Sequence, residues 1–436
     1  MKIRNMRQGD HAIHWMKDTT DAIVAKINAA DSALGVLDTL FGSPFYLYGA
    51  HYEDRLKGAP GQLIAQRDGG ICIATVDGSV WITHLKAGDQ VNCETTERTT
   101  GPGEGGNAKI RPLPNIKLPA TLALGQRAAN LPWSPLPINH TADYRTFQEI
   151  RYVEERGVGR LFFDYYNGAM SSDQCYRLRD AFLFARRQPT RVIELRGGID
   201  LFSNGIHLNI IEAADDPALE SWRNINAIDD LVLEILNTMS HLVIAGLCGN
   251  AGAGGAMLAL AADYVYARKG VVLNPHYQRM GLFGSEYWTY TLPRRVGSAQ
   301  AIAITQGCRP MGTVEAKETG LIDDCFGRDA AEFGHILALK SDQLSRSEDF
   351  WHLLNKKYER RIADERTKPL AYYRAEELTR MRENFYGPDP AYHVARQRFV
   401  YKGRPVRHRM ITFENRDGVP HDATLRVSDG LAQQAL

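Results

Sequence analysis

The chain has 436 residues, of which 44% are hydrophobic and 24% are charged. This length predicts two or three domains, and the composition excludes both a wholly disordered chain and a small disulfide scaffold. Lys and Arg together number 52 and Asp and Glu 51, which leaves a formal net charge of +1. Bulk charge therefore does not favour DNA, RNA or an anionic membrane as a partner.

The spacing of the cysteines and the distribution of apolar residues indicate in which cellular compartment the protein is found. The six cysteines form no CxxC pair and stand at no zinc-finger spacing from a histidine, so we expect reduced thiols and no metal site. Residues 1–7 lack the apolar segment of a signal peptide. Residues 242–262 carry no charge, but their glycines and Asn250 disfavour a membrane helix. We expect a cytoplasmic protein that binds neither nucleic acid nor membrane.

The first part of the chain, residues 1–118, has the pattern of a small antiparallel barrel. A helix is predicted over residues 18–30 from the spacing of its apolar side chains. Short apolar segments follow, and they are separated by the turn sequences Asp68-Gly69 and Asp77-Gly78, which are typical of hairpins. Repeated prolines then predict an extended linker over residues 119–143.

The central part, residues 144–328, alternates between strands and helices. Strands are predicted at 159–166, 190–196 and 242–247, and helices at 172–187 and 222–239. This alternation indicates an α/β core with crossover helices. The charged sequence of residues 329–414 predicts a helical region, and residues 415–436 are expected to be a disordered tail.

Two glycine-containing loops follow two of the predicted strands, at residues 196–208 and 243–257. A strand that opens through small residues into a helix can point backbone N–H groups at a ligand, and two such turns together could form an oxyanion hole. The second loop lacks the GK[ST] ending of a phosphate loop. Close packing of strand against helix is an alternative explanation for both loops.

The same segments resemble the crotonase (enoyl-CoA hydratase/isomerase) superfamily. The sequence FSNGIH at 202–207 is similar to the family's F-x-A-G-x-D loop, and IAGLCGNAGAGG at 244–255 to its second glycine segment; AKETGLID at 316–323 resembles a later motif. The resemblance implies an α/β crotonase core, the ClpP/crotonase-like ββα spiral. It also implies that the amides of Asn204 and Gly254 are oxyanion donors. The coenzyme A site it implies comprises Ser203, Asn204, Gly205, Ile206, His207 and Gly254.

The sequence departs from the family hydratases at both of their glutamate positions. Met257 occupies the first position, and the family register places Tyr277 at the second, so hydration of a double bond is disfavoured. The remaining candidates for acid–base roles are Glu286, Tyr277 and Tyr287. A surface position for Glu286 and simple packing for the two tyrosines are the alternatives.

The flanking segments extend the resemblance to a fusion family. Residues 1–118 resemble the C-terminal barrel of methionyl-tRNA formyltransferase, with IHW at 13–15 in place of the family's I-D-W. The sequence of residues 380–396 is similar to the end of the HypX/HoxX-type maturation factors of [NiFe] hydrogenases. The formyltransferase catalytic domain of that family is missing from this sequence. Tetrahydrofolate would therefore enter only through a domain that is absent here.

That second resemblance implies cleavage of formyl-CoA into carbon monoxide and coenzyme A, which supplies the CO ligand of the hydrogenase iron. Coenzyme A thioesters and hydrogenase maturation proteins are then the expected partners. Hydrolysis or decarboxylation of another acyl-CoA, or a coenzyme A-binding scaffold without catalysis, are the alternatives. The sequence leaves open whether the chain is a monomer or a crotonase-like oligomer.

Overall fold

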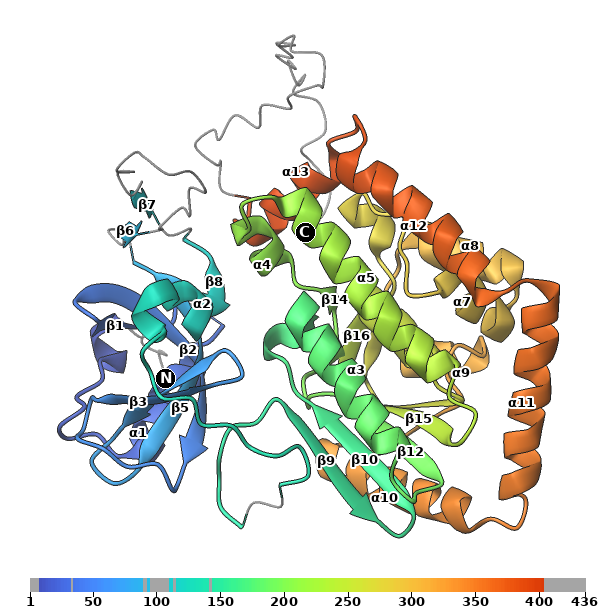
Figure 1. Cartoon of the computed structure of the whole chain (residues 1–436), viewed down its shortest axis with the longest axis horizontal. Coiled ribbons are helices and arrows are strands. Elements are labelled where there is room, and N and C mark those ends of the chain that lie inside the picture. The colour runs from blue at the N-terminus through green and yellow to red at the C-terminus, as the bar shows by residue number, and fades with distance from the viewer. Residues whose placement is uncertain are drawn as a thin grey trace, which may run out of the picture.

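The computed structural model describes residues 8–32, 34–88, 92–94, 110–112, 115–140 and 143–403. The tail expected at 415–436 and the last part of the helical region expected at 329–414 lie outside these residues. The described part of the chain forms an N-terminal β-unit, an α/β core and a set of C-terminal helices, which follow one another in sequence (Figure 1).

The N-terminal unit is an antiparallel sheet of six strands, in agreement with the hairpin pattern of the sequence. The order is β1-β2-β5-β4-β3, and β8 also pairs with β5. The strands are β1 (Val36–Leu40), β2 (Ser43–Glu53), β3 (Leu63–Arg67), β4 (Gly70–Ala74), β5 (Ser79–Ala87) and β8 (Lys117–Pro119). Arg67 pairs with Gly70, so Asp68 and Gly69 form a two-residue turn, and both have positive φ, as a type I′ turn requires.

Short helices complete this unit. Helix α1 (Thr20–Ala29) begins where the Thr19 hydroxyl accepts a hydrogen bond from the Ala22 amide, and Ile23 and Ile27 are buried against the sheet. The range expected to be a linker starts differently, because α2 (Ala120–Leu124) and η2 (Gly125–Ala128) follow β8 directly. Residues of α2 are buried in the hydrophobic core of the N-terminal unit. The remaining elements are η1 (Gln8–His11), β6 (Asn92–Glu94) and β7 (Ile110–Pro112).

The core contains a large sheet of six strands in the order β20-β17-β15-β12-β10-β9, parallel except for β9 at one edge. The strands are β9 (Ile150–Glu155), β10 (Val158–Phe163), β12 (Val192–Arg196), β15 (Leu242–Leu247), β17 (Tyr264–Arg268) and β20 (Asp324–Phe326). The middle strands are buried along their length, as expected where helices cover both faces of a parallel sheet.

Short strands form two further sheets beside the large one. The order of the first is β13-β16-β18-β19, and β11 pairs with β14 in the second. Their bounds are β11 (Ala169–Met170), β13 (Leu201–Ser203), β14 (Gly205–Ile206), β16 (Asn250–Gly252), β18 (Val272–Asn274) and β19 (Met311–Gly312). Each turn of the chain adds one strand to the large sheet and a short strand beside it, and then a helix follows. This is the ββα spiral predicted from the sequence.

Helices of the core cover the sheets: α3 (Ser172–Arg186), α4 (Leu208–Ala213), α5 (Pro217–Leu236), α6 (Gly254–Leu260), α7 (Trp288–Val296), α8 (Ser298–Gly307) and α9 (Thr313–Glu318). Two 3-10 turns, η3 (Tyr166–Gly168) and η4 (Tyr277–Met280), also belong to the core. The start of α5 differs from the predicted position, because Asp216 caps the helix by accepting from the Leu219 amide and Pro217 fits its first turn.

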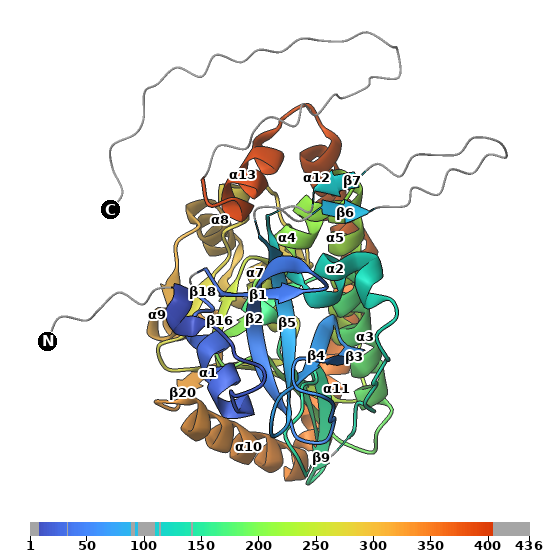
Figure 2. The ribbon, with the colours of Figure 1, turned by 90° about the vertical axis from the view of Figure 1, so that its left-hand side faces the viewer.

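Four helices follow the core, α10 (Ala330–Arg346), α11 (Phe350–Thr367), α12 (Leu370–Tyr386) and α13 (Ala391–Val400), and they wrap its outer side (Figure 1). Turning the molecule shows the N-terminal sheet in front of the core (Figure 2). Within the part of the chain that the structure describes, no helix combines the length and apolar character needed to span a bilayer. The uncharged segment 242–262 instead supplies β15, β16 and α6.

Candidate active site

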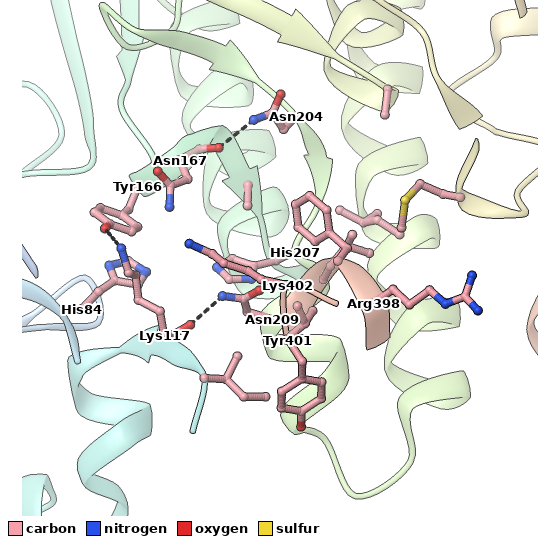
Figure 3. A pocket seen from close by; sticks show the side chains of 18 of the residues that line it. His84, Lys117, Tyr166, Asn167, Asn204, His207, Asn209, Arg398, Tyr401 and Lys402 are labelled. Atoms are coloured by element: carbon pink, nitrogen blue, oxygen red, sulfur yellow. Dashed lines mark hydrogen bonds between the residues drawn. The ribbon is translucent and has the colours of Figure 1, made fainter. Parts of the chain in front are cut away.

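A cavity of about 1070 Å³ lies between the N-terminal unit and the core (Figure 3). The N-terminal unit contributes His84 from β5 and Lys117 from β8. The core contributes segments around Asn204 and Tyr277, and residues 398–402 close another side. Three parts of the chain that are far apart in sequence therefore meet around one space.

The two predicted glycine loops meet beside this cavity. A Cβ atom at position 205 would lie 3.0 Å from the Gly254 nitrogen, so only glycine allows the approach. Gly254 is the first residue of α6, and the amide of a first helical residue has no acceptor within its helix. Ala253, the residue before it, lines the cavity. The position of the Gly254 amide suits a donor to a carbonyl oxygen.

The structure differs from the expectation at Asn204. The Asn204 amide donates to the Gly168 carbonyl oxygen at 2.7 Å, and its side-chain Nδ2 donates to the Asn167 carbonyl oxygen at 2.8 Å. The predicted oxyanion donor is thus engaged with the backbone of η3. Asn204 still lines the cavity, together with Asn167 (Figure 3).

The other residues expected at the coenzyme A site divide into two groups. Ile206 and His207 line the cavity, whereas Ser203 is fully buried and its hydroxyl accepts from the Gly205 amide at 3.1 Å. The His207 ring caps α4, because its Nδ1 accepts from the Ile210 amide at 3.2 Å. Burial lowers the pKa of His207 to about 4, so the ring is neutral and holds the loop rather than carrying charge.

Tyr277 lines the cavity, and Glu286 is buried behind it in a hydrogen-bonded pair. The Tyr277 hydroxyl, on a cavity-lining residue, donates to Glu286 Oε2 at 2.6 Å, and the Ser285 amide donates to the same oxygen at 3.1 Å. Oε1 of Glu286 lies against Gly254, where an added Cβ would be 2.1 Å away. Of the three predicted acid–base candidates, these two are therefore brought together beside the second glycine loop.

The buried environment raises the pKa values of both Glu286 and Tyr277. Burial raises the pKa of Glu286 to about 8, and the nearby negative charge of Asp229 acts in the same direction. Burial, followed by the charge of Glu286, raises the pKa of Tyr277 well above its usual range. The hydroxyl consequently keeps its proton near neutral pH, while the carboxyl group titrates there.

The third candidate, Tyr287, points elsewhere. Like Glu286, it is 1% exposed and does not itself line the cavity, but it makes no contact with Tyr277 like that of Glu286, and Arg374 is its side-chain partner. Burial raises the pKa of Tyr287, although Arg374 on α12 partly opposes this shift. Its amide donates to Glu377 at 2.9 Å. Tyr287 therefore belongs to the same loop as Glu286 but contacts α12.

Sequence reasoning missed the groups that support this pair. Asp229 on α5 accepts from the Glu286 amide at 2.8 Å and from the Ser285 hydroxyl at 2.7 and 2.9 Å. Glu377 on α12 accepts from the Tyr287 amide. Both carboxyl groups are 0% exposed. The sequence did contain a signal for both: each carboxyl residue stands on the apolar face of its helix, where a charged side chain is unusual. Asp229 is four residues after Ile225, and Glu377 is four residues before Met381.

It also missed the basic side chains of the cavity. The Lys117 ammonium lies 2.5 Å from the Tyr166 hydroxyl and 3.8 Å from the Tyr48 ring, and burial lowers its pKa to about 8. Figure 3 shows Lys117 and Lys402 extending into the space between the units. These lysines lie far apart in the sequence, at positions 117 and 402, so sequence spacing gave no indication that they meet.

Comparisons with known proteins agree with this architecture. The enoyl-CoA hydratase/isomerase family matches residues 165–384, and the C-terminal domain of formyl transferases matches residues 5–102. An enoyl-CoA hydratase from Bacillus halodurans is similar in fold, with a TM-score of 0.51 at 17% identity over 57% of this chain and 99% of its own. The core accordingly belongs to the enoyl-CoA hydratase/isomerase family, whose members act on coenzyme A thioesters.

Two longer proteins match both units at once. The hydrogenase maturation factor HoxX of Bradyrhizobium diazoefficiens is 44% identical over 397 residues, which are 91% of this chain and 64% of that protein. HypX from Aquifex aeolicus, in complex with tetrahydrofolic acid, superposes with a TM-score of 0.83 at 42% identity, covering 91% of this chain and 67% of its own. The chain belongs to the HypX/HoxX family of hydrogenase maturation factors, and it spans about two thirds of these relatives.

Proposed function

We propose that this chain cleaves formyl-CoA into carbon monoxide and coenzyme A, and so supplies the CO ligand during hydrogenase maturation. The observation that carries the proposal is the Tyr277–Glu286 hydrogen bond of 2.6 Å, which lies against Gly254 at one end of the cavity. A hydratase would need carboxyl groups where Met257 and Tyr277 stand, and Met257 is buried among apolar side chains.

The thioester would lie with its formyl group at the Tyr277 end of the cavity. The Gly254 amide is the candidate donor to the formyl oxygen, in place of the Asn204 amide, which is already bonded. Lys117 and Lys402 lie where the phosphates of coenzyme A could be bound, because ammonium groups pair with phosphate oxygens. The cavity volume of about 1070 Å³ suits an extended pantetheine arm.

The reaction needs one proton to move from carbon to sulfur. Glu286 takes the formyl proton, the C–H electron pair stays on carbon as the lone pair of CO, and the C–S pair leaves with sulfur. The Tyr277 hydroxyl protonates the thiolate and regains a proton from Glu286 through their hydrogen bond. The atoms balance as formyl-CoA giving CO and coenzyme A, without a redox step.

The test is incubation of the protein with formyl-CoA, with CO detected by its binding to haemoglobin. The E286Q and Y277F variants should each lose about 10²–10⁴-fold in CO formation, the usual contribution of a positioned acid or base. Release of formate without CO would indicate hydrolysis, and binding without turnover a scaffold. Wild-type rates in both variants would contradict these roles.

The family membership supports a wider proposal about partners. We infer that CO is passed on to hydrogenase maturation proteins and that the reaction takes place in the cytoplasm. HypX of Aquifex aeolicus binds tetrahydrofolic acid, and we propose that a formyl-folate donor supplies the formyl group upstream of this thioester. We assign none of the described residues to the folate.

A further inference from the structure

The loop that carries Glu286, residues 284–289, has an unfavourable backbone conformation. Glu286 and Tyr287 have φ values of +58° and +57°, and Gly284 has +93°. Side chains other than glycine rarely adopt this left-handed region, and two in succession need support from outside the loop.

Two carboxyl groups from distant helices give that support. Asp229 on α5 accepts from the Glu286 amide, and Glu377 on α12 accepts from the Tyr287 amide at 2.9 Å. Glu377 also accepts from the Thr289 amide at 2.8 Å and from its hydroxyl at 2.5 Å. The two carboxyl groups thereby bind the amides of Glu286, Tyr287 and Thr289, and they fix the direction of the Glu286 side chain.

Glu377 also serves as the cap of α7 from another helix. This helix begins at Trp288, and no side chain of its own loop caps it. A carboxylate at a helix N-terminus is stabilised by the unpaired amides and by the helix dipole. Burial raises the pKa of Glu377 to about 8, so its carboxyl group is only partly ionised near neutral pH.

The charges around Glu286 come from several elements. Asp229 faces it from α5 and Glu377 from α12, and Tyr277 donates to it from η4. Cys175 of α3 is close enough for the charge of Glu286 to raise the pKa of its thiol. Among the described residues, Arg374 brings a positive charge to this group, with its Nε 4.0 Å from Asp229. Burial raises the pKa of Asp229 and of Glu377, and Asp229 and Glu286 add to the shift at Glu377. Each carboxylate therefore makes ionisation of the next one harder.

We propose that Glu377 is a positioning residue for Glu286: it holds the left-handed loop that lays the Glu286 carboxyl group against Gly254. The inference rests on the proposed function for its catalytic meaning. It makes α12, which lies beyond the last strand of the core, a part of the active site.

The first measurement compares E377Q with E376Q. Glu376 is the neighbouring residue on the same helix, but it is exposed and paired with Lys368, so it is a matched control. A glutamine at 377 would turn an amide donor toward one of the bound N–H groups. We expect E377Q to lower kcat for CO formation at least tenfold with KM within threefold, and E376Q to leave both unchanged.

The second measurement follows the hydrogen bond of the Glu286 carboxyl group and does not need turnover. Infrared difference spectra against E286Q isolate the carbonyl stretching band of protonated Glu286, which is read in the wild type, E377Q and E376Q. Loss of the Tyr277 hydrogen bond should raise this frequency, so we expect the band to shift in E377Q and to stay unchanged in E376Q. A lower kcat with an unchanged band would mean that Glu377 does not set the position of Glu286, and it overturns the proposal.

The two readouts separate the possible failures. If the wild type makes no CO from formyl-CoA, the proposed function fails, while the infrared shift still decides whether Glu377 controls Glu286. If E377Q does not fold, E377D decides instead, since its shorter side chain keeps the carboxyl group but withdraws it from the loop amides. We then expect the Glu286 band to shift and kcat to fall at least fivefold; a wild-type kcat would overturn the proposal.

Discussion

The two loops at the proposed active site are held in different ways. The loop around Asn204 is fixed by its own neighbourhood, since its amides bond to Gly168 and to the Ser203 hydroxyl. The loop around Glu286 is held by carboxyl groups from α5 and α12. The comparison teaches that the glycine pattern marks a close approach of backbones, whereas the acid–base chemistry depends on side chains that come from far along the chain.

The sharpest test of this comparison is at the second glycine loop. A Cβ at position 254 would meet the Glu286 carboxyl group, a side chain, whereas a Cβ at 255 would lie 2.0 Å from the Ser203 carbonyl oxygen. We expect Gly254→Ala to lower CO formation by about 10²-fold or more in a folded protein. Gly255→Ala should instead lower the melting temperature.

Gly307→Ala is the matched control for both substitutions, because nothing lies within 4 Å of the Cβ it adds. Circular dichroism melting and the CO assay distinguish the three variants. If Gly254→Ala and Gly255→Ala lose activity and stability in parallel, the loops do not have separate roles.

The next test is the pH dependence of the wild type. Burial raises the pKa of Glu286 to about 8, and the base must be ionised to accept the formyl proton. The kcat for CO formation should therefore rise about tenfold per pH unit well below 8 and level off above it. Coenzyme A binding, measured in parallel, should change little over the same range. A rate independent of pH from 6 to 9 contradicts a base with this environment.

The same group predicts an effect on stability. Folding raises the pKa of Glu286 from 4.5, so between that value and about 8 the folded state binds more protons than the unfolded state. Its contribution to the free energy of unfolding therefore falls as the pH rises through this interval. E286Q, which cannot ionise, should gain up to about 4 kcal/mol relative to the wild type between pH 5 and pH 9. Parallel melting curves for both proteins at every pH would exclude this.

The smallest effect is expected at Asn204. Its amide is already bonded to Gly168, and its side chain lines the cavity without a charge. Asn204→Ala should leave kcat within about threefold and raise KM for formyl-CoA by less than about tenfold. A loss of kcat as large as that of Gly254→Ala would contradict this prediction and would mean that the Asn204 loop contributes to catalysis as much as the Gly254 loop does.

Much of the fold could be predicted from local patterns. The Asp68-Gly69 turn, helix α3 and strand β15 depend on short-range rules, and the alternation of strands and helices predicts an α/β core, whereas the spiral is implied by the resemblance to the crotonase superfamily. The Glu286–Tyr277 pair could also be nominated, because both residues stand near the expected thioester. Asp229 and Glu377 could not be, since contacts between α5, α12 and one loop arise only from tertiary packing. Lys117 and Lys402 meet for the same reason.

The position of α12 has a consequence for biosynthesis. A ribosome releases the strands and the Glu286 loop before it has made Glu377, and domains tend to fold in order of synthesis. The nascent core would therefore pass through a stage in which the loop lacks its second anchor and α7 has no cap. Catalytic competence would then arrive only with the late helices, so the emerging chain would not act on thioesters before it is nearly complete.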